Sequence, residues 1–259
     1  MSEKPFGIDV SKYQGKIDWD VVAAHAPKVV FTGIRATVNW GYTDSWFDRN
    51  WSEAKRVGIL RTAYHVIFPG ESASRQVNHF INTVGSDLGE LPLTLDIELD
   101  HGMSYTEIRD NLFACATLVE NQTGRKPIIY SRALWIDEHV TGPAGKVPKW
   151  LNEYDWWLAH YLRSSEEHPG PPRLPKGVDR ERCIIHQTGD HTVGFGVESK
   201  MLDYNRWQGD LESLYRYAGT TAEELEVEPQ PPSLEDRVLA LEAQLKALQE
   251  AARSQGWSV

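Results

Sequence analysis

The sequence has few cysteines, an excess of acidic over basic residues and no long apolar run, and each scarcity excludes a class of protein. Two cysteines, Cys115 and Cys183, are too few for a disulfide framework, and both lie in apolar patterns that favour buried thiols. Lys and Arg number 27 against 37 Asp and Glu, for a net charge of −10. A nucleic-acid-binding protein needs basic surface to neutralise phosphates, and a membrane span needs about 20 apolar residues. We therefore expect no nucleic-acid partner and no membrane partner.

We expect no secretory signal, because MSEKPFGIDV passes from a polar start directly into a strand pattern. We expect synthesis and folding in a reducing cytoplasm, with any export by another route. The chain has 259 residues, of which 41% are hydrophobic and 25% charged, values ordinary for a soluble globular protein. This length predicts one large domain, or one domain with an appendage.

The stretch Leu91–Leu99, which reads LPLTLDIEL, combines an apolar strand with two carboxylates near its end. Residues two apart in a strand point to the same face, so we expect Asp96 and Glu98 side by side and Leu99 on the opposite face. When two carboxylates lie this close together, their like charges raise the pKa of one of them, as a general acid requires at neutral pH. The alternative is a strand that ends at the surface, with both acids in water.

Strand patterns alternate with helix patterns along the first 218 residues, which indicates βα units and a mostly parallel sheet. Several of the connections are too short for a full helix. We therefore predict an α/β fold, an irregular (β/α)8-like barrel, in residues 1–218. The expected strands are Phe6–Val10, Val29–Thr37, Leu60–Phe68, Leu91–Leu99, Lys126–Ser131, Trp156–Tyr161, Cys183–Gln187 and one that ends at Asp203. The expected helices are Asp18–His25, Asp48–Val57, Ser72–Val84, Tyr105–Thr123 (capped by Thr106) and Leu211–Tyr217.

Four acids, Asp9, Asp96, Glu98 and Asp203, fall at the expected carboxyl ends of three separate strands. In barrels of this type the active site lies at that end. Acids converging from three strands on one rim favour a catalytic site over solvated surface.

The remainder of the chain has a different composition. Residues 219–233 are acidic and contain prolines, as linkers do. Residues 234–253 carry an apolar seam with four–three spacing, which is a heptad pattern typical of a short coiled coil. We predict a parallel homodimer through residues 234–252. The alternative is a single amphipathic helix packed on the barrel.

Several motifs, taken together and in order, resemble glycoside hydrolase family 25, the lysozymes that cleave peptidoglycan. The resemblance covers roughly residues 5–210 without a large insertion. Its segments are GIDVSKYQGKIDW, FTGIRAT, YTDSWFDRNWSEAKRVGI, TAYHVIFPG, LPLTLDIE, KPIIYS, WWLAHY and LDYNRW. The chain departs from the family at Val38–Trp40 and at His186–Thr188, which concern sugar contacts.

The resemblance implies a set of site residues. Glu98 corresponds to the catalytic glutamate of the family's D-x-E strand end, with Asp96 as its companion. Two further aspartates correspond to Asp9 and to Asp203 of the late D-x-N. Arg35 either binds substrate or pairs with a rim carboxylate, and of the adjacent Trp156 and Trp157 at most one faces the cleft. The implied groove residues are Tyr64, Tyr130, Trp157, Tyr161 and Gln187.

The resemblance also implies an activity: hydrolysis of the β-1,4 bond between N-acetylmuramic acid and N-acetylglucosamine. Glu98 would donate the proton, Asp96 would raise the pKa of Glu98 or orient the substrate, and the sugar's acetamido oxygen would attack C1. We expect no cofactor and no metal site, because Asp100 and His101 after the D-x-E have no second ligand group at suitable spacing. The favoured role is a phage-type endolysin acting on bacterial peptidoglycan after holin-type release. The alternatives are a wall-binding or structural barrel with little turnover, assembled through its tail helix, and a barrel glycosidase acting on chitin.

Overall fold

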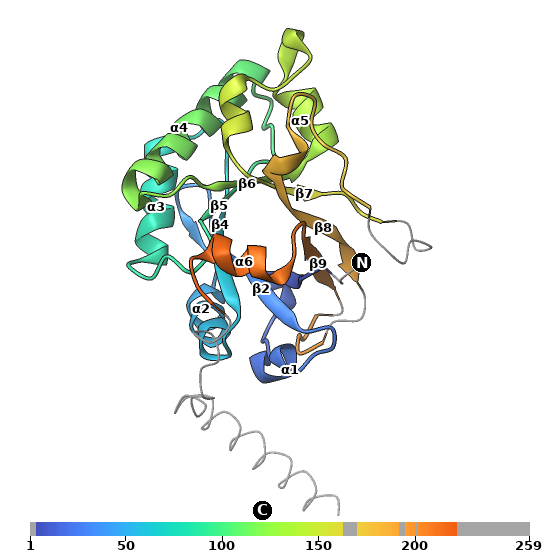
Figure 1. Ribbon diagram of the computed structural model, residues 1–259. Helices are drawn as coiled ribbons and strands as arrows, with labels where there is room; N and C mark the ends of the chain where they lie inside the picture. Colours follow the sequence, from blue (N-terminus) through green and yellow to red (C-terminus); the bar gives the residue numbers. More distant parts are fainter. Residues whose placement is uncertain (1–3, 163–169, 192–194, 200, 222–259) are drawn as a thin grey trace, which may run out of the picture. The chain divides into compact units, whose positions relative to one another are not determined.

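The computed structural model describes residues 4–162, 170–191, 195–199 and 201–221. These residues form a closed barrel surrounded by helices (Figure 1). The linker beyond residue 221 and the heptad segment 234–253 lie outside the described residues, so the dimer through that segment stays a prediction. Among the described helices, none is long and apolar enough to cross a membrane.

Eight strands close the barrel, as the sequence predicted, and a short ninth strand extends it. The order around the sheet is β1-β9-β8-β7-β6-β5-β4-β2, with β3 added to β2, and pairing of β1 with β2 completes the ring. The strands are β1 (Phe6–Val10), β2 (Val29–Val38), β3 (Tyr42–Thr43), β4 (Leu60–Val66), β5 (Thr94–Asp96), β6 (Ile128–Arg132), β7 (Trp156–Ala159), β8 (Cys183–His191) and β9 (Leu202–Trp207).

The last strand runs in the opposite direction to its neighbours, which corrects one prediction. Within the ring, β1, β2 and β4 to β8 pair in parallel, but β9 is antiparallel to both β8 and β1. The added strand β3 is antiparallel to β2. Asp203 therefore lies near the beginning of β9, not at its end. Because the strand is reversed, its beginning lies at the same rim as the carboxyl ends of the others, and Asp203 pairs in register with Asp9. Asp203 thus lies at the predicted rim, but because β9 is reversed and not because Asp203 ends a parallel strand.

The strand that contains the D-x-E motif is much shorter than its apolar run. Only Thr94–Asp96 pairs as β5, so Glu98 lies beyond the hydrogen-bonded strand. Alternation holds through Leu95 and Ile97, which are fully buried away from the cavity described below. It fails at Leu99, which lines that cavity instead of the opposite face. The side-chain alternation of a strand lasts only as long as its backbone stays extended and paired.

Six α-helices in the described part of the chain cover the barrel, and most of their starts follow from local capping. Asp18 and Ser72 cap α1 and α3 as their sequence positions suggest. The cap of α4 is Ser104, not the predicted Thr106, and Ser104 forms a capping box with Glu107. The seven-residue α5 was not predicted. The helices are α1 (Trp19–Ala23), α2 (Phe47–Arg56), α3 (Ala73–Val84), α4 (Tyr105–Thr123), α5 (Ala133–His139) and α6 (Leu211–Ala218), with 3-10 turns at Lys12–Gln14, Gly142–Ala144, Lys149–Glu153 and Arg180–Arg182.

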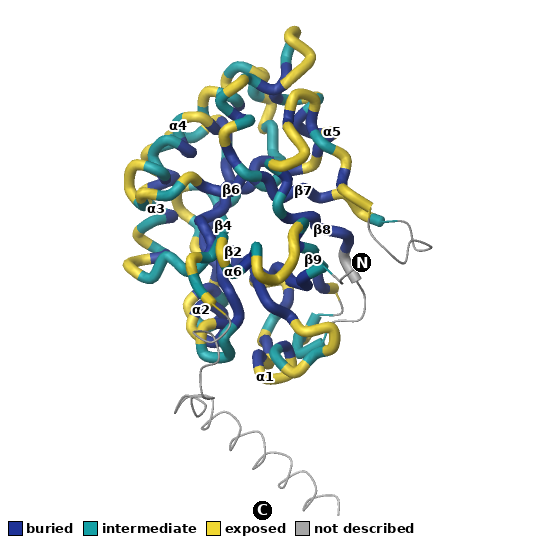
Figure 2. Tube along the Cα trace, in the orientation of Figure 1, coloured by how far each residue is buried: buried dark blue, intermediate teal, exposed yellow. Residues whose placement is uncertain are grey.

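Two apolar clusters fill the molecule and leave one end of the barrel open. The larger lies between the strands and the surrounding helices, and the buried strands form the dark ring in Figure 2. The smaller fills the barrel around Phe31 and Trp157, and Leu214 of α6 belongs to it. A Cβ at Gly33 would overlap the Trp157 ring, so glycine there lets the indole enter the barrel. The packed interior is the floor of the site.

Candidate active site

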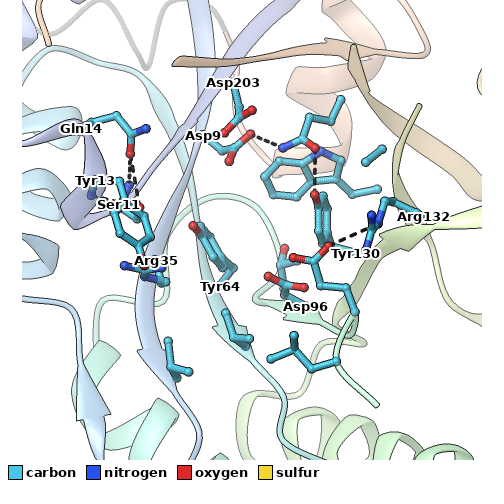
Figure 3. Close-up of a pocket in the computed structure, with 18 of the residues that line it drawn as sticks. Asp9, Ser11, Tyr13, Gln14, Arg35, Tyr64, Asp96, Tyr130, Arg132 and Asp203 are labelled. Carbon is cyan, nitrogen blue, oxygen red and sulfur yellow. Dashed lines mark hydrogen bonds and ion pairs between the residues drawn. The ribbon is translucent and has the colours of Figure 1, made fainter. Parts of the chain in front are cut away.

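A cavity of about 650 Å³ opens at the rim where the carboxyl ends of the parallel strands meet. All ten residues that the sequence singled out line it, although they come from eight strands and from the segments that follow two of them. Figure 3 shows Tyr64 and Asp96 between Arg35 on one side and Arg132 on the other, with Asp9 and Asp203 close together. The predicted residues in the lining are Asp9, Arg35, Tyr64, Asp96, Glu98, Tyr130, Trp157, Tyr161, Gln187 and Asp203.

Asp9 is buried at the end of β1 and held by two side-chain amides. Gln187 Nε2 and Asn205 Nδ2 both donate to Asp9 Oδ2, at 2.9 and 2.8 Å. Burial raises the pKa of Asp9 to about 6, although the two amide donors oppose the shift; the charge of Glu98 adds to it. Asp9 therefore changes charge near neutral pH inside the cavity.

The two amides are themselves oriented by aromatic side chains. The Tyr130 hydroxyl donates to Gln187 Oε1 at 2.8 Å, and Trp157 Nε1 donates to Asn205 Oδ1 at 2.7 Å. Each amide oxygen is thus occupied, so each amide N–H group faces Asp9. The network fixes the position of one carboxylate from β6, β7, β8 and β9 together.

Asp96 and Glu98 lie in different surroundings. Asp96 is buried, and its Oδ1 atom has no hydrogen-bond partner among the described residues. Burial, followed by the charges of Glu98 and Asp9, raises the pKa of Asp96 well above its usual range. The Glu98 side chain is 32% exposed, and Arg132 Nε lies 3.6 Å from its Oε2 atom.

The electrostatics of this pair differ from the sequence argument, which expected Asp96 to raise the pKa of Glu98. Burial raises the pKa of Glu98 and Arg132 partly opposes it, while the larger elevation falls on Asp96. Asp96 is deeper and has two neighbouring acids, so its charged form is the costlier one. Burial therefore favours the protonated form of both carboxyl groups, and more strongly that of Asp96.

Arg35 pairs with a buried carboxylate, as one of its two interpretations expected, and substrate binding by Arg35 stays a prediction. Its Nε atom donates to Asp44 Oδ2 at 2.8 Å in a buried ion pair, and its guanidinium lies 5.0 Å from the Tyr13 ring centre. Its Nη2 atom has no partner among the described residues, and the side chain lines the cavity. Asp44 also accepts from the backbone N–H groups of Lys12 and Trp46, so it is fixed in place.

The model of glycosyl hydrolases family 25 matches residues 8–189. The chain belongs to this family. It is 38% identical to the Escherichia coli K12 protein named "Uncharacterized protein YegX", over 82% of this chain and 72% of that protein. It is 30% identical to Lysozyme M1 of Streptomyces globisporus, over 83% of this chain and 72% of that protein. The solved structure of a bacterial lysozyme from Streptomyces coelicolor matches with a TM-score of 0.66 and 28% identity, covering 84% of this chain and 98% of that chain.

Membership of family 25 confirms the fold expected from the ordered motifs, and the structure adds residues that sequence reasoning did not select. Asn205 was visible in the late D-x-N but received no role. Tyr13 and Gln14 belong to the N-terminal motif and line the cavity from a 3-10 turn. Arg132 is the last residue of β6 and lies one residue beyond the predicted strand Lys126–Ser131.

Of the two adjacent tryptophans, Trp157 lines the family 25 cavity, and Trp156 packs in the cluster between strands and helices. Among the described residues, no group of three or more His, Cys, Asp or Glu side chains is arranged to hold a metal ion. The groups that line the cavity include carboxyl groups, phenols, amides and two arginines.

Proposed function

We propose that this chain is a lysozyme that cleaves the β-1,4 bond between N-acetylmuramic acid and N-acetylglucosamine in peptidoglycan. The observation that carries the proposal is the placement of a partly exposed Glu98 beside a buried, unpartnered Asp96 in the open end of a family 25 barrel. Relatives named lysozyme support the choice of substrate.

In the first step, the Glu98 carboxyl donates its proton to the glycosidic oxygen. The bond between C1 and that oxygen breaks, and the N-acetylglucosamine side leaves as an alcohol. The carbonyl oxygen of the muramic acid acetamido group attacks C1, which gives a cyclic oxazolinium intermediate. Burial raises the pKa of Glu98, which supports a protonated acid before the reaction begins.

Asp96 acts on the acetamido group in this mechanism. Asp96 lines the cavity, and its Oδ1 atom has no hydrogen-bond partner among the described residues, so we assign it the acetamido N–H as its donor. That hydrogen bond turns the acetamido oxygen toward C1. Tyr64 and Tyr130 remain neutral phenols, because burial raises their pKa values well above the usual range. They supply hydroxyl groups at the sugar-binding surface.

In the second step, a water molecule gives a proton to the Glu98 carboxylate, and its oxygen attacks C1. The oxazolinium ring opens, the acetamido group is restored, and Glu98 again carries the proton. Asp9 is held in the same cavity by two amides, and its pKa is raised to about 6. Its charge therefore contributes to the electrostatic potential in which Glu98 and the intermediate react.

The experiment compares wild type, Glu98→Gln and the control Glu212→Gln on purified bacterial cell walls. Glu212 lies on the exposed face of α6, so its substitution tests the amide change alone. We expect new reducing ends on muramic acid, detected by mass spectrometry, with wild type and with Glu212→Gln. We expect Glu98→Gln to retain the thermal unfolding temperature of wild type and to lose at least about 10³-fold in rate.

Two outcomes contradict the proposal. Near-normal lysis by Glu98→Gln would remove Glu98 from the role of acid. Wall binding by wild type in a pull-down without new reducing ends would favour the wall-binding alternative. The role of a phage-type endolysin that reaches the wall after holin-type release is proposed from the sequence pattern alone.

A further inference from the structure

A second cavity, of about 430 Å³, adjoins the first one. Arg132, Ala159 and Tyr161 line both cavities. The second cavity extends from them along α5 and the end of β7 to Arg173. A ligand bound beside Glu98 in the first cavity can therefore extend past these shared residues into the second cavity.

The lining of the second cavity carries two arginines whose ionic contacts are long. Arg132 is 57% exposed and lies 3.6 Å from Glu98, whereas Arg173 is 50% exposed and its Nη2 atom lies 3.5 Å from Asp137. Neither contact reaches the usual length of a charge-assisted hydrogen bond. Both guanidinium groups retain N–H donors for a ligand that carries carboxylates.

The segment that carries Arg173 is fastened to the barrel. The backbone N–H of Arg173 donates to His160 Nδ1 at 3.1 Å, and the backbone N–H of Lys176 donates to Asp137 Oδ1 at 2.7 Å. The carbonyl oxygen of His160 in turn accepts a hydrogen bond from His186 Nε2, at 2.7 Å. The arginine is thus presented by backbone tied to β7, β8 and α5, which lowers the entropy cost of binding.

The remaining lining is both apolar and acidic. Leu134 is 61% exposed, and Trp135 contributes an aromatic surface. The Glu138 side chain is 76% exposed. The cavity therefore offers two cations, one anion and an apolar wall, which suits an amphoteric peptide better than an uncharged sugar.

We propose that the second cavity binds the peptide stem attached to a muramic acid residue next to the cleaved bond. The inference rests on the proposed function. In peptidoglycan with intact stems the lactyl carboxyl of muramic acid is bound in an amide, so the charged groups beside the cleaved bond belong to the peptides. Arg173 binds a peptide carboxylate, and Glu138 is placed for an ammonium group of the same stem. Arg173 thereby determines specificity for peptide-bearing glycan.

The test measures kcat and KM on two substrates: soluble glycan chains with intact stem peptides, and the same chains stripped by an amidase that cuts between muramic acid and the peptide. The variants are Arg173→Ala, Arg173→Glu and the control Arg216→Ala, an exposed arginine on α6 that pairs with Glu212. We expect Arg173→Ala to raise KM on the intact substrate by about tenfold, and by much less on the stripped substrate, with kcat nearly constant. Charge reversal in Arg173→Glu should widen that difference, and Arg216→Ala should leave both values at the wild-type level.

Equal losses on both substrates would overturn the inference, because the cavity would then contact the glycan or its lactyl groups. Unchanged KM values on both substrates would overturn it too. Each variant's unfolding temperature is measured, so that a folding defect is not taken for a binding defect. If wild type cleaves neither substrate, the proposed function fails, and that result is distinct from a failure of the peptide site alone.

Discussion

The Nε atom of Arg132 lies 3.6 Å from the Oε2 atom of Glu98, so a partly exposed cation stands beside the proposed proton donor. Burial raises the pKa of Glu98 and Arg132 lowers it. The acid is thus tuned by two opposing influences from different parts of the fold. Arg132 also lines both the reaction cavity and the second cavity. One side chain therefore contacts both the proton donor and the proposed peptide site.

Replacing Arg132 by Gln should move the alkaline limb of the pH–activity profile to higher pH. A general acid loses activity as pH rises through its pKa, and removing a neighbouring cation raises that pKa. We expect a shift of less than about one pH unit, since water screens both side chains. The measurement is kcat/KM against pH, with Arg216→Gln as the control. A limb that stays in place or moves to lower pH would contradict the influence of Arg132 on Glu98.

Asp9→Asn should stabilise the protein at pH 7 while reducing activity. The pKa of Asp9 is raised from 3.8 to about 6, so the folded state holds a proton that the unfolded state releases between those values. This contribution to stability is therefore full below about pH 4 and is lost as pH rises through about 6. The neutral amide avoids the loss, and we expect a gain of up to about 3 kcal/mol at pH 7 and little gain at pH 4.

Urea unfolding of Asp9→Asn at the two pH values checks this prediction. Asp210→Asn is the matched control, because Asp210 is an exposed cap of α6 and asparagine caps equally well. A variant that is less stable than wild type at pH 7 would show that the carboxylate contributes more through Gln187 and Asn205 than burial removes.

Gln187→Glu should destabilise the protein in a pH-dependent manner. The substitution keeps an acceptor for the Tyr130 hydroxyl, but it places a second carboxylate where an amide now donates to Asp9. We expect a loss of about 2–4 kcal/mol in unfolding free energy at pH 7.5, and a smaller loss at pH 5 where one carboxyl is protonated. Chemical denaturation at both pH values measures it, beside Gln208→Glu at a partly exposed site that pairs with Lys4. Equal losses at both pH values would indicate a packing defect instead of repulsion.

The buried pair of Arg35 and Asp44 should show strong coupling in a double-mutant cycle. Asp44→Ala leaves the guanidinium buried without its partner and removes an acceptor from two backbone N–H groups, so we expect a loss of about 3–5 kcal/mol. Adding Arg35→Met should recover part of that loss, because no unpaired buried charge then remains. The free energies of unfolding of both single variants and the double variant decide the outcome. Additive losses would contradict the coupling.

The barrel and its acidic rim were predictable because their signals are local. Apolar runs such as Val29–Thr37 identify buried strands, and Asp18 and Ser72 identify helix starts, since each side chain caps its own neighbours. The long connection beyond Ser131 gave no such signal. The seven-residue α5 within it has no side-chain cap and was missed.

Other features depend on contacts between distant residues and could not be predicted from local patterns. Glu98 lies beyond the paired part of β5, and Leu99 turns into the cavity where an ideal strand would turn it away. Asp203 reaches the rim because β9 is reversed, a property of strand pairing that no residue in LDYNRW encodes alone. Asn205 and Gln187 acquire their roles by meeting Asp9, almost 200 positions earlier in the chain.

The sequence by itself determined the α/β class, the family motifs and the identity of the carboxyl groups that face the cavity, because these follow from hydrophobic periodicity and from residue type. The tertiary structure alone decided the charge of those groups. Burial and neighbouring charges set the pKa values of Asp9, Asp96 and Glu98, and the fold places Arg132 beside Glu98. The pKa values and this contact depend on distances that exist only after the barrel closes.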